Sequence, residues 1–431
     1  MDNAKKVYAW ALYDWANSSF ATTVMAGFFP LFFKEYWSQG ANPTDSTFKL
    51  GMANSVASVI VAAMSPVLGA IADKGGVKKK FLMFFTVLGV VMSGGLFFVA
   101  QGAWMAAAAL FVLASIGFSG GMSFYDALIV DVAEARKMDL VSAIGYGAGY
   151  LGGGLLFTFN VAMYLKPHLF GLADGAEAVR VSFILVALWW AVFSVPLFLL
   201  VPEPRVEHGR SMGQLAMDGF RQLGETLRVM GRLKTLFTFL VGYWLYIDGV
   251  DTVIRMAVDY GMSLGFDSSS LIVALLITQF VGFPAAIIFG KVGEKLGSKT
   301  GIYLGIGVYV GVTIWGYFLQ TVEQFYGMAV AIGLVQGGVQ SLSRSIYARL
   351  IPQTKAAEFF GLYNMLGKFA AVIGPMLMGW VALATGNPRH GILSIIILFA
   401  AGGALLWFVD VSKGEAAARE LDAQANAQVS N

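Results

Sequence analysis

The sequence predicts an all-α polytopic membrane protein in which twelve transmembrane helices form two six-helix bundles. Hydrophobic residues make up 57% of the 431 residues and charged residues only 13%, against about 25% charged in ordinary soluble domains. Apolar runs of roughly 20 residues, enough to cross the hydrocarbon of a bilayer, recur along the whole chain. They fall into two groups of six on either side of the longest polar stretch, 202–234.

The predicted spans divide the chain into four parts. Residues 1–201 hold an N-terminal six-helix bundle and 235–410 a C-terminal one, joined by a cytoplasmic linker at 202–234 and followed by a cytoplasmic tail at 411–431. Apolar residues at helical spacing in the linker predict an amphipathic helix on the membrane surface, whereas the polar, Ala-rich tail is typical of a frayed helix. The twelve spans are 8–36, 50–72, 80–101, 104–132, 141–165, 178–201, 235–260, 269–292, 300–320, 324–350, 358–385 and 390–410.

Lysine and arginine lie mainly on one side of these spans, which determines the orientation. They cluster before the first span, in the loops after the second and eighth spans, and throughout the linker. Apart from Arg255 and Lys368, which lie within spans, the opposite side keeps only Lys34, Lys49, Lys166, Arg180 and Arg389. Because cytoplasmic loops are enriched in these residues, both termini are predicted to be cytoplasmic.

Several chemistries are excluded by what the chain lacks. It has no cysteine, and its three histidines, His168, His208 and His390, fall in predicted loops, so no metal site is expected. No phosphate-binding loop of the Walker type is present, and no Ser/His or Cys/His constellation suits an intramembrane enzyme. The net charge of +3 comes from short loops and indicates no nucleic-acid surface. The sequence therefore predicts neither an enzyme nor a bound cofactor.

The first span carries a carboxylate, Asp14, where the bilayer favours hydrocarbon. Such a group costs several kcal/mol unless it has a partner, a proton or a water-filled cavity. Asp14, Asn17, Ser18 and Thr22 recur at spacings of three and four, which places them on one face of a helix. That face either lines a solvated pathway or forms a polar contact with a neighbouring helix.

Other intramembrane charges lie on the fourth and seventh spans. Asp126 ends a stripe of serines on the fourth, and Asp131 near the boundary is expected to pair with Arg136 or with a neighbouring loop. On the seventh, Asp248, Asp251 and Arg255 step by three and four along one face. This set is either a self-neutralised ladder or part of a binding site in which Asp248 is the deeper acid.

The tenth and eleventh spans carry further polar side chains. Tyr363, Asn364 and Lys368 mark a polar stretch of the eleventh. A buried Lys368 needs a counter-ion, and Asp14 or Asp126 is the expected partner. Gln340 and Arg344 lie on a polar face of the tenth, where Arg344 either anchors the helix end or takes part in gating.

Two loops repeat the same pattern at equivalent positions in the two halves. Glycine, three residues, a carboxylate and a basic residue appear as Gly69, Asp73 and Lys74 after the second span. They appear again after the eighth as Gly290, Glu294 and Lys295. The glycine allows close helix approach, and the carboxylate can form an ion pair in one conformation and lose it in another. Both loops are therefore candidate gating elements.

These paired loops resemble the signature loop of the major facilitator superfamily of secondary transporters. The first span, from Trp10 through Tyr13-Asp14-Trp15-Ala16-Asn17 to Thr23, is similar to the branch that contains the autophagy-related vacuolar amino-acid effluxers and their bacterial relatives. The resemblance continues through Phe124–Ala127, Ser343–Ser345 and Phe360–Asn364. It implies two bundles around a midplane site, lined by helices one, four, seven and ten, that opens alternately to each side.

The expected function is secondary transport of small solutes, with efflux of amino acids as the class that the resemblance implies and protons as a candidate coupling ion. Charges of both signs suit a zwitterion: Arg255 or Lys368 for its carboxylate, Asp14 or Asp248 for its ammonium. A proton-coupled drug or sugar transporter and a non-transporting receptor or scaffold are the alternatives. The protein is expected to act as a monomer in a bacterial inner membrane, or in a vacuolar membrane if it is eukaryotic.

Overall fold

The computed structural model describes residues 3–40, 43–203, 221, 224, 226, 233–263 and 265–429, and these residues form helices joined by short turns. Eleven helices in this part of the chain are long and apolar enough to cross a membrane. The run 3–37 precedes them and is helical throughout, although π turns interrupt it. Counted with this run, the twelve predicted spans and their division into six and six are confirmed.

The N-terminal half begins with α1 (Asn3–Ser19), which continues into the π-helix η1 (Phe20–Phe28), then α2 (Phe29–Phe32) and η2 (Phe33–Trp37). Its other elements are α3 (Pro43–Gly75), α4 (Lys78–Gly95), η3 (Leu96–Phe98), α5 (Trp104–Ala127), α6 (Ile129–Val132), η4 (Ala135–Lys137), α7 (Met138–Leu165), η5 (Pro167–Phe170) and α8 (Gly175–Leu200).

The C-terminal half comprises α10 (Lys234–Ser263), α11 (Ser268–Leu296), α12 (Ser298–Tyr317), α13 (Val322–Leu350), η6 (Gln353–Lys355), α14 (Ala356–Thr385), α15 (Pro388–Ser394) and α16 (Ile396–Trp407). The twelfth predicted span is thus two short helices separated by Ile395. The tail is an ordered helix, α17 (Val411–Val429), and not a frayed one. The amphipathic helix predicted in the linker falls largely outside the described residues.

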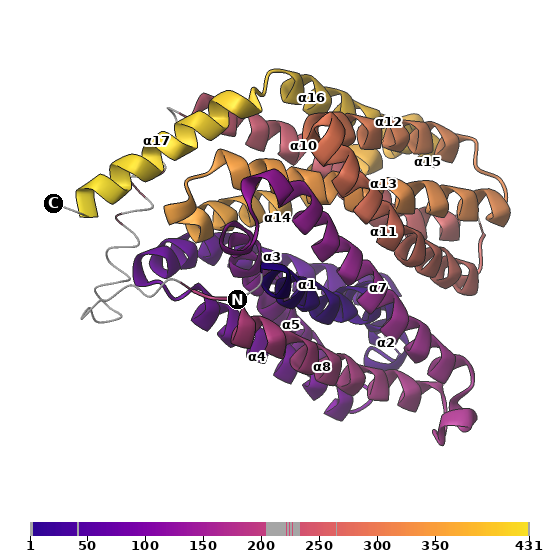
Figure 1. The fold of residues 1–431 in the computed structure, drawn as a ribbon. Helices are drawn as coiled ribbons and strands as arrows, with labels where there is room; N and C mark the ends of the chain where they lie inside the picture. The colour runs from indigo at the N-terminus through magenta and orange to yellow at the C-terminus, as the bar shows by residue number, and fades with distance from the viewer. Residues whose placement is uncertain are drawn as a thin grey trace.

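Figure 1 shows the halves side by side, the N-terminal helices in indigo and purple and the C-terminal ones in orange and yellow. They meet in two equivalent pairs, α3 against α14 and α7 against α11. Large apolar side chains such as Phe84, Val192, Ile288 and Leu304 are exposed in mid-helix. A soluble monomer rarely exposes so much apolar surface, whereas a helix facing lipid tails does so without cost.

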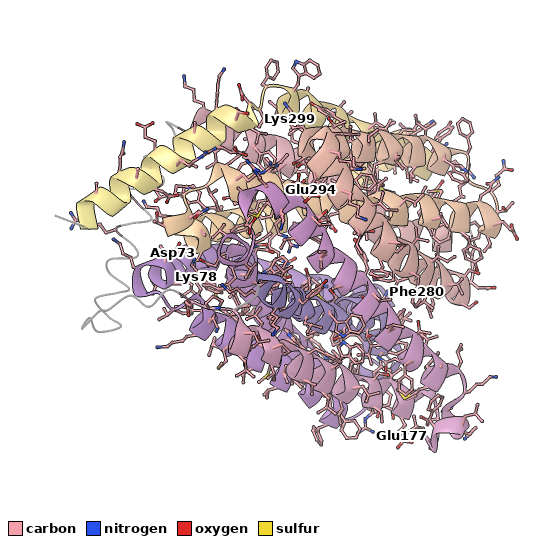
Figure 2. The ribbon with its side chains drawn as sticks, in the orientation of Figure 1. Asp73, Lys78, Glu177, Phe280, Glu294 and Lys299 are labelled. Carbon is pink, nitrogen blue, oxygen red and sulfur yellow. The ribbon has the colours of Figure 1, made fainter. Side chains whose placement is uncertain are left out.

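The loops after α3 and α11 lie at one end of the helices, which we call the basic end because Lys78, Lys79, Lys295 and Arg349 gather there. Figure 2 shows Asp73, Lys78 and Glu294 toward this end and Glu177 at the opposite one. Each repeated glycine lies where the halves touch. A Cβ atom at Gly69 would collide with the backbone of Ala357 on α14. One at Gly290 would lie 2.5 Å from the Cβ of Ala143 on α7.

Replacing Gly69 by alanine is therefore expected to hold α3 away from α14 and open the basic end. Because the chain contains no cysteine, Ala143→Cys supplies a single reporter that α11 covers in the closed state. Its alkylation by a membrane-impermeant maleimide should become several-fold faster in Gly69→Ala. Gly51→Ala on the same helix is the control, since a Cβ there meets nothing within 4 Å. Equal rates in the two variants would contradict a role for Gly69 in closure.

Candidate functional site

A buried ionic cluster joins the two halves close to the basic end. Nη1 of Arg344, on α13, lies 2.9 Å from Oδ1 of Asp126 on α5 and 3.6 Å from Oδ2 of Asp14 on α1. The Asn364 side-chain amide on α14 donates to Asp126 over 3.2 Å, and the Tyr125 hydroxyl donates to Asp14 over 3.0 Å. Arg344, and not Lys368, is the cation beside these two carboxylates.

The remaining donors of Arg344 are directed at α7. Nε donates to Oγ of Ser142 over 2.9 Å, and Nη2 donates to the Ser142 carbonyl over 2.9 Å. The guanidinium also lies 4.3 Å from the ring centre of Tyr146 and 4.9 Å from that of Trp10, a cation–π arrangement that suits its planar charge. Arg344 therefore connects the C-terminal half to α1, α5 and α7 at once.

The cluster holds two acids and one base. If both carboxylates are ionised it carries one net negative charge, in a place where an uncompensated charge is costly. A proton, or a cationic group on a bound solute, would balance it. This arrangement can therefore couple the binding of a positive charge to the strength of the bridge between the halves.

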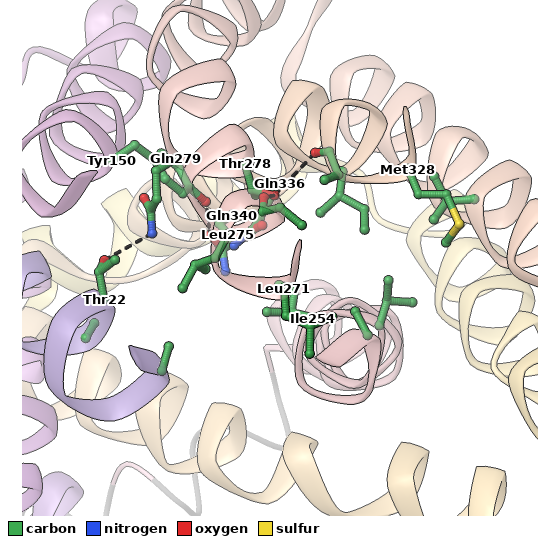
Figure 3. A pocket seen from close by; sticks show the side chains of 18 of the residues that line it. Thr22, Tyr150, Ile254, Leu271, Leu275, Thr278, Gln279, Met328, Gln336 and Gln340 are labelled. Carbon is green, nitrogen blue, oxygen red and sulfur yellow. Dashed lines mark hydrogen bonds between the residues drawn. The ribbon is translucent and has the colours of Figure 1, made fainter. Parts of the chain in front are cut away.

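A cavity of about 410 Å³ starts beside this cluster and lies between the halves. Asp14 is the one Asp, Glu, Lys or Arg side chain in the described lining. Amides and hydroxyls follow it: Gln279 donates to Thr22 over 3.0 Å, and Tyr150 donates to Gln340 over 3.2 Å. Both contacts cross from one half to the other, and Figure 3 shows these polar groups together.

The other walls of the cavity come from apolar side chains, most of them in the C-terminal half. Two lining amides keep an acceptor without a hydrogen bond, Oδ1 of Asn17 on α1 and Oε1 of Gln336 on α13. Unsatisfied buried acceptors of this kind favour a ligand with N–H or O–H groups. The apolar lining includes Val253, Ile254, Leu271, Leu275, Val312, Phe325, Met328, Ile332 and Ile392.

The predicted site residues divide into three groups. Asp14, Asn17 and Gln340 line the cavity, and Asp126 and Asn364 lie one contact away in the ionic cluster. Spans one, four, seven and ten line the cavity as predicted, and residues of α7, α11, α12, α14 and α15 line it too. Tyr363 is stacked between Tyr243 and Tyr347, at ring-centre distances of 4.3 and 4.6 Å. Tyr363 and Lys368 lie outside the lining.

Asp248 has a structural partner. Both of its carboxylate oxygens accept the backbone N–H of Gly374 over 3.0 Å, just before Pro375 interrupts the hydrogen bonding of α14. It therefore supports a helix–helix contact within the C-terminal half and does not face the cavity. Asp251 is outside the lining as well. The side chain of Arg255 lies outside the described residues, so the ladder on α10 stays a prediction.

The basic end is closed by two carboxylates from the N-terminal half. Asp73 accepts the backbone N–H groups of Ala357 over 3.1 Å and Glu358 over 2.8 Å at the start of α14. A carboxylate is favoured there because the first N–H groups of a helix lack partners. Lys78, and not the exposed Lys74, pairs with Asp73 over 3.6 Å. Lys78 also reaches Asp131 over 3.4 Å, which confirms that Asp131 pairs with this loop.

The second carboxylate is Asp139 on α7, which the sequence patterns did not single out. It accepts the hydroxyl groups of Ser298 over 2.7 Å and of Ser345, and it lies 3.5 Å from Arg349. Glu294, the loop acid predicted for this role, is exposed instead. One feature of the sequence could have indicated Asp139: it is an acid in the first turn of a helix, directly after the basic residues Arg136 and Lys137.

Comparisons with known proteins agree with this geometry. A family model described as "Vacuole effluxer Atg22 like" matches residues 44–138 and 130–419. The chain is 39% identical to the "Uncharacterized MFS-type transporter YxiO" of Bacillus subtilis over 94% of this chain and 95% of that protein. It is 22% identical to "Autophagy-related protein 22" of Eremothecium gossypii, over 97% of this chain and 93% of that protein.

Solved structures of major facilitator transporters share the fold. The human organic anion transporter MFSD10 superposes with a TM-score of 0.75 at 15% identity, over 94% of this chain and 100% of that one. FucP, solved in an outward conformation, superposes with a TM-score of 0.68 at 12% identity, over 95% of this chain and 98% of that one.

Replacing Arg344 by glutamine should leave two buried carboxylates without their base. Loss of one partner from a buried ion pair destabilises by about 3–5 kcal/mol, so the midpoint of thermal unfolding in detergent should fall clearly below that of the unsubstituted chain. Arg419→Gln is the control, because that side chain is exposed and pairs only locally with Glu415. Adding Asp126→Asn to Arg344→Gln should recover part of the loss. An unchanged midpoint in Arg344→Gln would contradict a stabilising role of Arg344 between Asp14 and Asp126.

Proposed function

This chain belongs to the Atg22-like family of major facilitator transporters, and on that premise we propose that it exports amino acids across a membrane by alternating access. The observation that carries the proposal is the cavity that begins at Asp14 while the basic end is closed by contacts between the halves. A site between two bundles that is sealed from one side is what alternating access requires. The amino-acid class is the one that the family resemblance favours.

The lining offers groups for both ends of a zwitterion. Asp14 is the group for an ammonium, and the free acceptor of Asn17 adds a second contact for its N–H donors. For the carboxylate, the lining offers the amide and hydroxyl donors of Gln279, Gln336 and Tyr146 in place of Lys368, which lies outside it. The apolar C-terminal wall then suits an aliphatic or aromatic side chain.

Proton coupling is proposed from the charge balance of the ionic cluster. Protonation of Asp14 or Asp126 would weaken the hold on Arg344 and favour separation of the halves. Opposite movement of a proton and a cationic group through this one acidic site would couple the two fluxes. A proton-coupled drug or sugar transporter is the second candidate, and the largely apolar lining is the observation that favours it.

We also propose the orientation and the location. The Lys and Arg distribution favours a cytoplasmic basic end with both termini on that side. The linker at 202–234 would then be a cytoplasmic tether between the halves. In this orientation the basic end is closed on the cytoplasmic side. The cavity lies on the other side of these contacts, toward the end that carries Glu177. The relative from Bacillus subtilis favours a bacterial cytoplasmic membrane.

Asp14→Asn tests the proposal directly. Counterflow of labelled amino acids in proteoliposomes, measured with and without a pH gradient, should be lost or should no longer respond to the gradient. The amount of folded protein should stay close to that of the parent. Asp267→Asn is the control, because Asp267 is exposed and makes no side-chain capping bond to α11.

The outcomes separate the candidates. Counterflow in Asp14→Asn equal to that of the parent would make Asp14 structural and remove the basis of the proposal. Counterflow of a sugar or a cationic drug, but of no amino acid, would favour the second candidate. If the parent chain shows no counterflow of amino acids, sugars or cationic drugs, the protein is favoured to be a receptor or scaffold that keeps the transporter fold.

A further inference from the structure

The C-terminal helix α17 packs against the basic end, although its sequence suggested a frayed tail. It contacts α13, α10 and η6, and Figure 1 shows it in yellow crossing the ends of C-terminal helices. Gly414 lies against Leu350 at the end of α13, and Ala418, one turn on, is buried. A polar helix held in this way needs specific contacts, because it has little apolar surface to bury.

The first specific contact is an ion pair between α17 and Arg349, the residue that also contacts Asp139 at the closed basic end. Glu415 lies 3.7 Å from Nη1 of Arg349. The other terminal nitrogen of Arg349, Nη2, lies 3.5 Å from Asp139 and donates to Ser298 over 2.5 Å. Arg349 therefore links α17 to Asp139. Asp139 is the carboxylate of the N-terminal half that holds α7 in contact with α12 and α13.

The second contact is made by Asp422, seven residues after Glu415 and so on the same face of the helix. Its carboxylate accepts the backbone N–H of Gln353 over 2.9 Å and that of Thr354 over 3.1 Å. The Thr354 hydroxyl also donates to it, over 2.7 Å. These residues form η6, which leads directly into α14, and the first N–H groups of α14 are those that Asp73 accepts.

We propose that α17 is a brace for the closed basic end, in which Glu415 positions Arg349 for Asp139 and Asp422 positions η6 and α14 for Asp73. Both C-terminal segments that receive a carboxylate from the N-terminal half are thus held by one helix. Release of α17 loosens both receiving segments and favours the state in which the basic end is open. Arg349 and Asp139 become gating residues, and Glu415 and Asp422 positioning residues.

This inference rests on the alternating access in the proposed function, but its test needs no substrate. Nitroxide labels on Ala135→Cys and Lys295→Cys, two exposed positions of the basic end on opposite halves, report its opening by pulsed electron paramagnetic resonance in nanodiscs. The native chain has no cysteine to interfere. The measured quantity is the ratio of the long-distance to the short-distance population.

Glu415→Gln should raise this ratio about twofold to fivefold, the range expected for one partly exposed ion pair. Glu420→Gln should leave it unchanged, since Glu420 is exposed on the same helix and contacts Gln424 of that helix. Asp422→Asn should raise the ratio independently, because it acts through η6. Similar distributions in Glu415→Gln, Asp422→Asn and Glu420→Gln would overturn the proposal.

A double-mutant cycle tests whether Glu415 acts through Arg349. In an Asp139→Asn background, Glu415→Gln should have little further effect, since the contact it positions is already gone. A full effect in that background would overturn the shared role of Arg349. If Asp139→Asn does not fold, Arg349→Gln provides the same background.

The outcome for the brace is separable from that for transport. Shifts in the distance ratio together with an absence of counterflow would support the brace and contradict the proposed transport activity. Intact counterflow with an invariant distance ratio would contradict the brace and leave transport standing.

Discussion

The neutralisation of charge inside the bilayer is the constraint on which the rest of the structure depends. Arg344, Asp126 and Asp14 lie where neither a lone cation nor a lone carboxylate is tolerated, so helices from both halves must converge on one point. The Ser142 hydroxyl and carbonyl and the rings of Trp10 and Tyr146 complete the surroundings of the guanidinium. The cavity adjoins the cluster at Asp14, which belongs to both.

The basic end is closed by two helix pairs that occupy equivalent positions in the two halves. The acids that form these contacts are not equivalent. The α3–α14 and α7–α11 pairs are related, and a glycine of each repeated loop allows each pair to approach. In both, however, the carboxylate comes from the N-terminal half, as Asp73 in one and Asp139 in the other. The C-terminal half supplies the hydrogen-bond donors, so its own loop acid, Glu294, is not needed for the contact. This asymmetry leaves the C-terminal tail as the element that holds the donors in place.

The cavity is asymmetric in the same sense. Its amide and carboxylate groups come from α1, α11 and α13, whereas most of the remaining lining from the C-terminal half is apolar. A solute with a charged or hydrogen-bonding end and an apolar body can satisfy both regions at once. Gln279 with Thr22 and Tyr150 with Gln340 form hydrogen bonds between the halves within this lining, and a bound solute that replaced these contacts would act on both bundles.

The sequence by itself determined the membrane class, the twelve spans, the paired loops and the face of α1 that lines the cavity, because apolar run length and helical periodicity are local properties. It also identified Asp14, Asp126 and Arg344 as noteworthy charges. Only the tertiary structure decided which charges meet: Arg344 took the place expected for Lys368, Asp139 that of Glu294, and Asp248 turned to the backbone of Gly374. Periodicity places a side chain on a face of its helix, but the partner depends on how helices distant in sequence are packed. That packing is set by the sum of many contacts, and no local pattern records it.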